Sequence, residues 1–213
     1  MRAAKVETEV RQDQIAQAAL GVIGRYGLKG LSVARVARQV GFVPSAIYRH
    51  FDSKERVLDA VLELIRERLY GNVDSVRRET PEPLEQLRRL LARHVQLIQE
   101  NQGIPRIIFS DELYVGHPER RARVYATLRG YLKRVAGLIR TGQEARRLST
   151  ACDADVLAVM FLGLIQPSAI LWHVSGGKFD VARQAELAWQ VFSSCLRGKR
   201  RDNHEYGPCP SVA

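Results

Sequence analysis

Cysteine is scarce in this chain of 213 residues, which contains only Cys152, Cys195 and Cys209. Their spacing does not match the paired cysteines of zinc or redox sites, and the first two stand among apolar residues, as small core side chains often do. The sequence therefore predicts a protein of a reducing compartment, the cytoplasm, without a metal site.

The motifs that mark most enzymes are also missing. The sequence has no Gly-rich phosphate loop, no nucleophile elbow, and no His-x-x-x-His or Cys-x-x-Cys pair. The five histidines lack the spacing of metal ligands: His50, His94, His117, His173 and His204. We therefore expect no catalytic residues and no cofactor, and a helical enzyme remains only as an alternative.

Long uncharged segments are rare, and the one exception is residues 156–175, which contain no Asp, Glu, Lys or Arg. That length spans a bilayer, but Gln166, Pro167, Ser168 and His173 interrupt the segment and no second span accompanies it. The N-terminal residues also lack the apolar core of a secretory signal. We therefore expect no membrane association.

Basic residues are plentiful. The chain has 33 Lys and Arg against 23 Asp and Glu, a net charge of +10. Residues 1–54 hold nine of the basic and four of the acidic residues, so half of the excess lies in a quarter of the chain. This distribution favours a polyanionic partner bound near the N-terminus.

Apolar residues recur with helical spacing along the whole chain, and strand-like alternation is almost absent. The sequence predicts an all-α fold of about nine helices, in which a three-helix helix-turn-helix domain precedes a larger helical domain. We place the first domain at residues 1–54, the second at residues 55–197, and a disordered tail at residues 198–213, where Lys, Arg and Pro follow without periodicity.

Helix signals in the first domain are well defined. An apolar stripe from Ile15 to Tyr26 ends at Gly27, which suits a left-handed turn. Ser32 is a good N-cap for a second helix that ends before Gly41, and Pro44 suits the first position of a third. Asp52 or Ser53 can cap a fourth helix that starts near Lys54. Three short helices joined by tight turns are typical of a DNA-binding module.

The same segment resembles the tetracycline-repressor (TetR) family. The similarity is carried by Gly30-Leu-Ser32, Val36-Ala37, Val40-Gly41, Ile47-Tyr48-Arg-His50-Phe51-Asp-Ser-Lys54-Glu55 and Leu58. It extends from about Ile15 to Leu58, and the later helices fit the family in number and order without a shared motif. The resemblance implies a bacterial transcription regulator of the cytoplasm and nucleoid.

The resemblance also implies roles for particular residues. It places Ser32, Tyr48, His50 and Lys54 at DNA phosphates, and Val33, Pro44, Ser45, Ala46 and Arg49 near base edges. It places Ile47 and Phe51 in the core. One position departs from the family, because Val43 stands where Ser or Thr is common and brings no hydroxyl for capping or phosphate binding.

The uncharged helix predicted from Asp153 to Val174 is apolar nearly all round, which suggests burial on two sides. The resemblance implies that this helix and the last one pair with a second copy of the chain to form a homodimer. The alternative is a wholly intramolecular core. Our candidates for the dimer interface are Leu164, Ser168, Trp172, Trp189, Phe192 and Cys195.

A small-molecule effector would bind within the second domain, among apolar side chains with a few polar groups. Each candidate residue has an alternative role as plain core or solvated surface. The candidates are His94, Phe109, Glu112, Tyr125, Tyr131 and Phe161.

We therefore expect a ligand-responsive repressor that binds a palindromic operator in double-stranded DNA as a homodimer and is released by a small apolar or amphipathic effector. The effector and operator are not identified by the sequence. The main alternative is a DNA-binding protein without small-molecule control.

Overall fold

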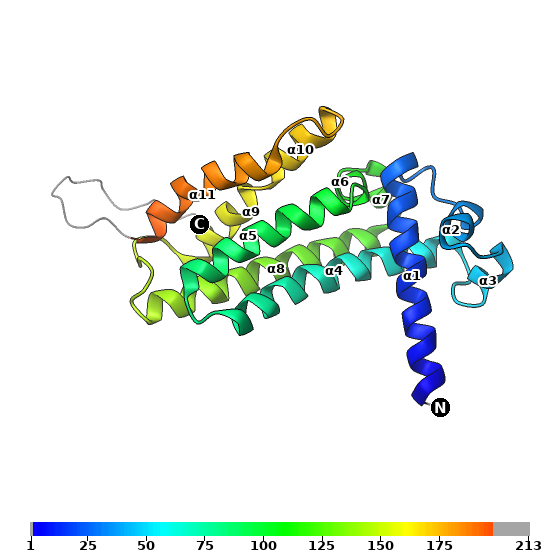
Figure 1. Cartoon of the computed structure of the whole chain (residues 1–213), viewed down its shortest axis with the longest axis horizontal. Helices are drawn as coiled ribbons and strands as arrows, with labels where there is room; N and C mark the ends of the chain where they lie inside the picture. The colour runs from blue at the N-terminus through cyan, green and yellow to red at the C-terminus, as the bar shows by residue number, and fades with distance from the viewer. Residues whose placement is uncertain (1, 198–213) are drawn as a thin grey trace. The chain divides into compact units, whose positions relative to one another are not determined.

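The structure is a computed structural model that describes residues 2–197 of the chain, with side chains from residue 8 onward (Figure 1). The predicted disordered tail, residues 198–213, lies outside the described residues. Within them the fold is helical and has no strand, which confirms the predicted all-α class. The helices are α1 (Arg2–Tyr26), α2 (Val33–Val40), α3 (Pro44–Tyr48), α4 (Lys54–Glu79), α5 (Pro83–Glu100), α6 (Gly103–Ile108), α7 (Asp111–Tyr114), α8 (Pro118–Glu144), α9 (Ala154–Gly163), α10 (Gln166–Val174) and α11 (Val181–Arg197).

The described residues contain eleven helices where the sequence suggested about nine, because two expected helices are each divided. The apolar segment after Gly103 forms α6 and α7, with a break at Phe109 and Ser110. The long apolar helix divides into α9 and α10 at Leu164 and Ile165. Pro167 lies in the first turn of α10, where its missing N–H leaves no helical bond to lose.

The first compact unit comprises Met1–Leu69 and Leu97–Thr127. It contains the three N-terminal helices and also α6 and α7, because α6 packs against α1. Ile15, Ile23 and Ile47 are fully buried in this unit. The unit is therefore built from two separate stretches of chain, and the functional boundary at residue 54 stays a prediction.

Close approach between α1 and α6 depends on glycine. A Cβ atom added to Gly103 would lie 2.7 Å from Cδ1 of Leu20 and closer still to the Leu20 carbonyl oxygen. Beside this contact, Asn101 is buried and accepts hydrogen bonds from Gln17 at 3.3 Å and from Arg68 at 3.1 Å. The amide of one residue thus joins α1 and α4 to the end of α5.

The second unit comprises Tyr70–Gln96 and Leu128–Ala213, and it is described as far as Arg197. In it, α10 contacts both α9 and α11. The aromatic core has Phe192 at its centre, with ring centroids 6.0 Å from Phe161 and 6.1 Å from Trp189. All three side chains are at most 4% exposed, so the last helices have a well-packed interior of their own.

Candidate DNA-binding site

The turn between α2 and α3 is built as the sequence predicts. The Ser32 hydroxyl accepts a hydrogen bond from the backbone N–H of Arg35 at 3.3 Å and so caps α2. Gly41 ends the helix in the left-handed region with a φ of 81°, which favours glycine because a Cβ atom would be strained there. These two features fix the two ends of α2, and α3 begins three residues after Gly41, at Pro44.

The short helix α3 has one buried side and one exposed side. Ile47 is fully buried and Phe51 is 9% exposed, so both belong to the core as predicted. Ser45 and Arg49 are exposed, and Tyr48 is 53% exposed. The helix therefore exposes a hydroxyl, a phenol and a guanidinium, while the packing of its apolar side holds it in place.

Two predicted phosphate contacts are constrained by their surroundings. Ser32 already uses its hydroxyl for capping. The Nδ1 atom of His50 is buried without a hydrogen-bond partner among the described residues, so only the other ring nitrogen can reach a phosphate. The backbone carbonyl of His50 accepts a hydrogen bond from Gln12 on α1 at 3.5 Å. Of the two residues, His50 is thus held directly against α1.

Lys54 begins α4 and is exposed. The preceding residue, Ser53, accepts a hydrogen bond from the backbone N–H of Arg56 at 3.2 Å, so it is Ser53 whose side chain caps this helix. Among the remaining predicted contacts, Pro44 is exposed, whereas Val33 and Ala46 are half-buried. The structure thus gathers the predicted DNA-binding residues onto α3, the start of α2 and the start of α4.

The predicted effector residues are divided between the two units. His94, Tyr131 and Phe161 are buried in the second unit, whereas Phe109, Glu112 and Tyr125 are exposed in the first. Glu112 forms an ion pair with Lys29 at 3.0 Å, so its carboxylate already has a cationic partner. Only the three buried residues therefore share the interior of one unit.

His94 and Tyr131 form a buried polar pair. The His94 Nδ1 atom and the Tyr131 hydroxyl lie 3.2 Å apart, within hydrogen-bonding distance, and the two rings meet edge to face. Burial lowers the pKa of His94 to about 4 and raises the pKa of the Tyr131 hydroxyl. Both groups are consequently uncharged at pH 7, which suits an apolar interior.

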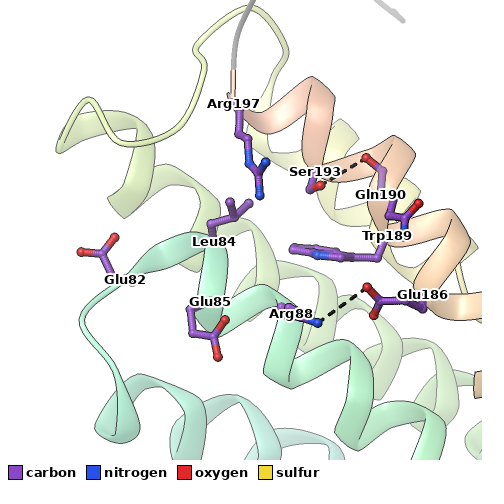
Figure 2. A pocket seen from close by; sticks show the side chains of 9 residues that line it. All are labelled: Glu82, Leu84, Glu85, Arg88, Glu186, Trp189, Gln190, Ser193 and Arg197. Atoms are coloured by element: carbon purple, nitrogen blue, oxygen red, sulfur yellow. Dashed lines mark hydrogen bonds and ion pairs between the residues drawn. The ribbon is translucent and has the colours of Figure 1, made fainter.

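A surface pocket of about 500 Å³ lies elsewhere in the second unit, between the start of α5 and α11 (Figure 2). Arg88 and Glu186, 3.6 Å apart, stand on one side of Trp189, and Arg197 stands on the other. The full lining is Glu82, Leu84, Glu85, Arg88, Glu186, Trp189, Gln190, Ser193 and Arg197. None of the predicted effector residues lines this pocket, and its charged rim does not resemble an apolar ligand site.

Family models match both parts of the chain. Residues 15–61 match the model described as bacterial regulatory proteins, tetR family, and residues 80–198 match the model described as tetracyclin repressor-like, C-terminal domain. The chain belongs to the TetR family. As a TetR-family protein it is a ligand-responsive, DNA-binding transcription regulator that acts as a homodimer, and it is not an enzyme.

Individual relatives are distant but cover nearly the whole chain. Nucleoid occlusion factor SlmA of Vibrio vulnificus is 24% identical over 188 residues, which are 88% of this chain and 96% of that protein. The fatty acid metabolism regulator protein of Bacillus subtilis is 23% identical over 189 residues, 87% of this chain and 95% of that protein.

Solved structures show the same TetR fold. FadR from Bacillus subtilis, in complex with stearoyl-CoA, has a TM-score of 0.69 and 23% identity, covering 85% of this chain and 97% of that one. FadR from Bacillus halodurans has a TM-score of 0.71 and 24% identity, covering 91% of this chain and 97% of that one. Because all these identities are low, the structural similarity shows the fold alone.

The TetR dimer candidates divide by exposure. Cys195 is exposed and Leu164 half-buried, but Ser168, Trp172, Trp189 and Phe192 are buried within the single chain. The exposed large apolar side chains of α9, α10 and α11 are Val156, Val159, Met160, Ile170, Leu171, Val174, Leu187 and Val191. The inner faces of these helices are thus buried within the chain itself, whereas their outer apolar faces are exposed.

One stretch of this TetR domain, Ala154–Val174, is long and apolar enough to cross a membrane by length and composition alone. It lies inside the matched C-terminal domain, and Leu157, Ala158 and Phe161 on its inner side are buried in the helical core. A core helix of a soluble protein has the same composition, and this family is one of soluble DNA-binding regulators.

Lys54 provides a test of phosphate binding. We expect Lys54→Ala to weaken binding to all duplex sequences alike, because a side chain that binds a phosphate does not distinguish bases. The slope of log affinity against log salt should fall by about 0.9 for each phosphate that is no longer neutralised, or about 2 for a dimer. Fluorescence anisotropy titrations at several salt concentrations measure this slope. The exposed Lys133→Ala on α8 is the control, and an equal slope in both variants would contradict phosphate binding by Lys54.

Proposed function

We propose that this protein is a repressor that reads a near-palindromic operator with α3 and releases it when an amphipathic effector with a long apolar chain binds. The observation that carries the DNA-binding part is the exposed pair Tyr48 and Arg49 next to the fully buried Ile47. Donors placed rigidly in this way can hold a phosphate, the role proposed for Tyr48, or read a base edge in the major groove, the role proposed for Arg49. Two copies would occupy grooves about 34–36 Å apart or a multiple of that distance.

The proposed residues have distinct roles. Four residues bind phosphates: Ser32, Tyr48, His50 and Lys54. Arg49 and the first turn of α3 read base edges, and Val33 lies near them. The first-turn residues are Pro44, Ser45 and Ala46. The exposure of Arg49 and the lack of an ion-pair partner for it in the described part of the chain support its role, because a paired guanidinium would have to break its ion pair before binding.

The effector proposal rests on two independent features. FadR of Bacillus subtilis, which shares the fold, was solved with stearoyl-CoA. In this chain the second unit buries His94 and Tyr131, two uncharged polar groups within an apolar interior. Such an environment suits the thioester end and apolar chain of an acyl ligand better than a charged molecule. We therefore keep His94, Tyr131 and Phe161 as effector residues.

The outer faces of α9, α10 and α11 are the proposed dimer interface. Their exposed apolar residues repeat at helical spacing, as Val156, Val159 and Met160 show on α9. Leu164 and Cys195 belong to this face, and the buried Trp172, Trp189 and Phe192 support it from behind. A regulator of this kind works in the bacterial cytoplasm, on the nucleoid.

Stearoyl-CoA tests the effector proposal directly. At about 100 times its Kd, it should stabilise the protein by about 2.7 kcal/mol and raise the Tm by about 5–10 °C. It should also weaken operator binding, because an effector shifts an equilibrium only through its different affinity for the two states. Coenzyme A without the acyl chain is the matched control and should do neither.

A specific alternative remains, because relatives named nucleoid occlusion factor match as well as the fatty acid regulator does. If stearoyl-CoA and a panel of shorter acyl thioesters change neither Tm nor operator affinity, while the protein still binds its operator, DNA binding without acyl control is the correct description. The Tyr131→Phe variant refines a positive result, since loss of the hydroxyl alone should reduce the thermal shift.

A further inference from the structure

Val43 directly precedes α3 and is unusually placed for a valine. Its side chain is 64% exposed, and its extended backbone, with φ of −82° and ψ of 149°, is that of an N-cap residue. It makes no side-chain capping hydrogen bond, which a Ser or Thr hydroxyl there would make. The position therefore does without a cap and instead projects a branched apolar side chain beside the exposed end of α3.

The neighbouring side chains are also apolar. Pro44 is exposed, and Ala46 lies three residues after Val43, on the same side of the first turn, where its backbone N–H donates to the Val43 carbonyl at 2.9 Å. Ser45 is the only residue of this turn with a polar side chain. The polar residues Tyr48 and Arg49 stand at the opposite end of the helix.

The major groove of DNA offers one apolar group to such a surface, the 5-methyl group of thymine. Polar base edges placed against carbon would lose their hydrogen bonds to water without replacement, which is unfavourable. We infer that Val43, together with Ala46, selects a T·A pair in each half-site of the operator by contacting the thymine methyl group. The inference rests on the proposed use of α3 as the reading helix, and it makes Val43 a specificity-determining residue.

The expected effect follows from the size of the group. Burying one methyl-sized group changes an affinity by about fourfold, so removing the thymine methyl from both half-sites should weaken binding by about 15-fold. Truncating Val43 to alanine should cost a similar amount on the natural operator. On DNA that already lacks the methyl group, the truncation should cost little, because there is no methyl group left for Val43 to contact.

The test uses an operator duplex selected from random sequences with the full-length protein. Each thymine is replaced in turn by deoxyuridine in both half-sites, and Kd values are measured for the wild type, Val43→Ala and Val115→Ala. Val115 is 71% exposed in the same unit and is the matched control. We expect one thymine position at which deoxyuridine weakens binding by the wild type and by Val115→Ala, but hardly affects Val43→Ala.

Two results would overturn the inference. One is the lack of any thymine position sensitive to the methyl group; the other is an equal deoxyuridine effect in wild type and Val43→Ala. If Arg49→Ala still weakens binding in that case, α3 remains the reading helix and only the role of Val43 is lost. If Arg49→Ala and Val43→Ala both bind like wild type, the proposed use of α3 fails as well.

Discussion

Replacing Arg49 by alanine should reduce operator affinity by about 30-fold or more. A guanidinium that makes two hydrogen bonds to a guanine edge contributes about 1–3 kcal/mol, and a dimer places one such guanidinium in each half-site. Arg49 is exposed at the end of α3 and is positioned by Ile47, which is fully buried, so its loss should not unfold the domain. Fluorescence anisotropy with the selected operator measures the effect.

The Arg49 prediction has a built-in specificity readout. Because Arg49 reads a base, Arg49→Ala should also relax the preference at one position of each half-site, unlike Lys54→Ala, which should leave sequence preference unchanged. The exposed Arg121→Ala on α8 removes the same charge from another surface and should bind like wild type. Unchanged affinity for both Arg49→Ala and Tyr48→Ala, with normal folding, would show that α3 does not read the operator.

The α2–turn–α3 segment could be predicted closely because its signals are local. Ser32 caps α2, Gly41 has the left-handed conformation, and Pro44 begins α3, each within a few residues of the feature it determines. Such signals depend on backbone chemistry, so they can be recognised without knowing the rest of the fold. The burial of Ile47 and Phe51 followed instead from the resemblance to the TetR family.

The second unit was harder to predict because its important choices are not local. Trp189 and Phe192 are apolar residues on an amphipathic helix, but only tertiary packing decides that they are buried within the chain while Val191 between them faces outward. Likewise, Phe109 and Tyr125 are aromatic residues that the structure leaves exposed. Helical periodicity identifies an apolar side chain, but it cannot distinguish a chain's own core from an interface with a second copy.

The polar contacts between α1 and the α5–α6 segment were not predicted at all. Gln17 and Asn101 are 84 positions apart, and neither has a neighbouring motif that suggests the other. The extension of α1 back to Arg2 was missed for a related reason, since the apolar stripe that signals the helix begins only at Ile15. Gly103 could have drawn attention to the contact, because it is the first residue of α6 and glycine has a low propensity for a helix.

Gly103→Ala should destabilise the protein by about 3 kcal/mol, the upper part of the range for overpacking, and lower the Tm by about 6–12 °C. The new methyl group would meet the backbone carbonyl oxygen of Leu20 and, at 2.7 Å, its Cδ1 atom. A flexible side chain could move aside, but a helix carbonyl cannot, so α1 and α6 would have to separate. Thermal unfolding followed by circular dichroism measures the loss.

The matched control is Gly21→Ala, on the same stretch of α1, where an added Cβ meets nothing within 4 Å. That variant should be stabilised by about 0.5–1 kcal/mol, because alanine favours a helix over glycine. Equal Tm values for the two variants would show that α1 and α6 do not pack closely at this point.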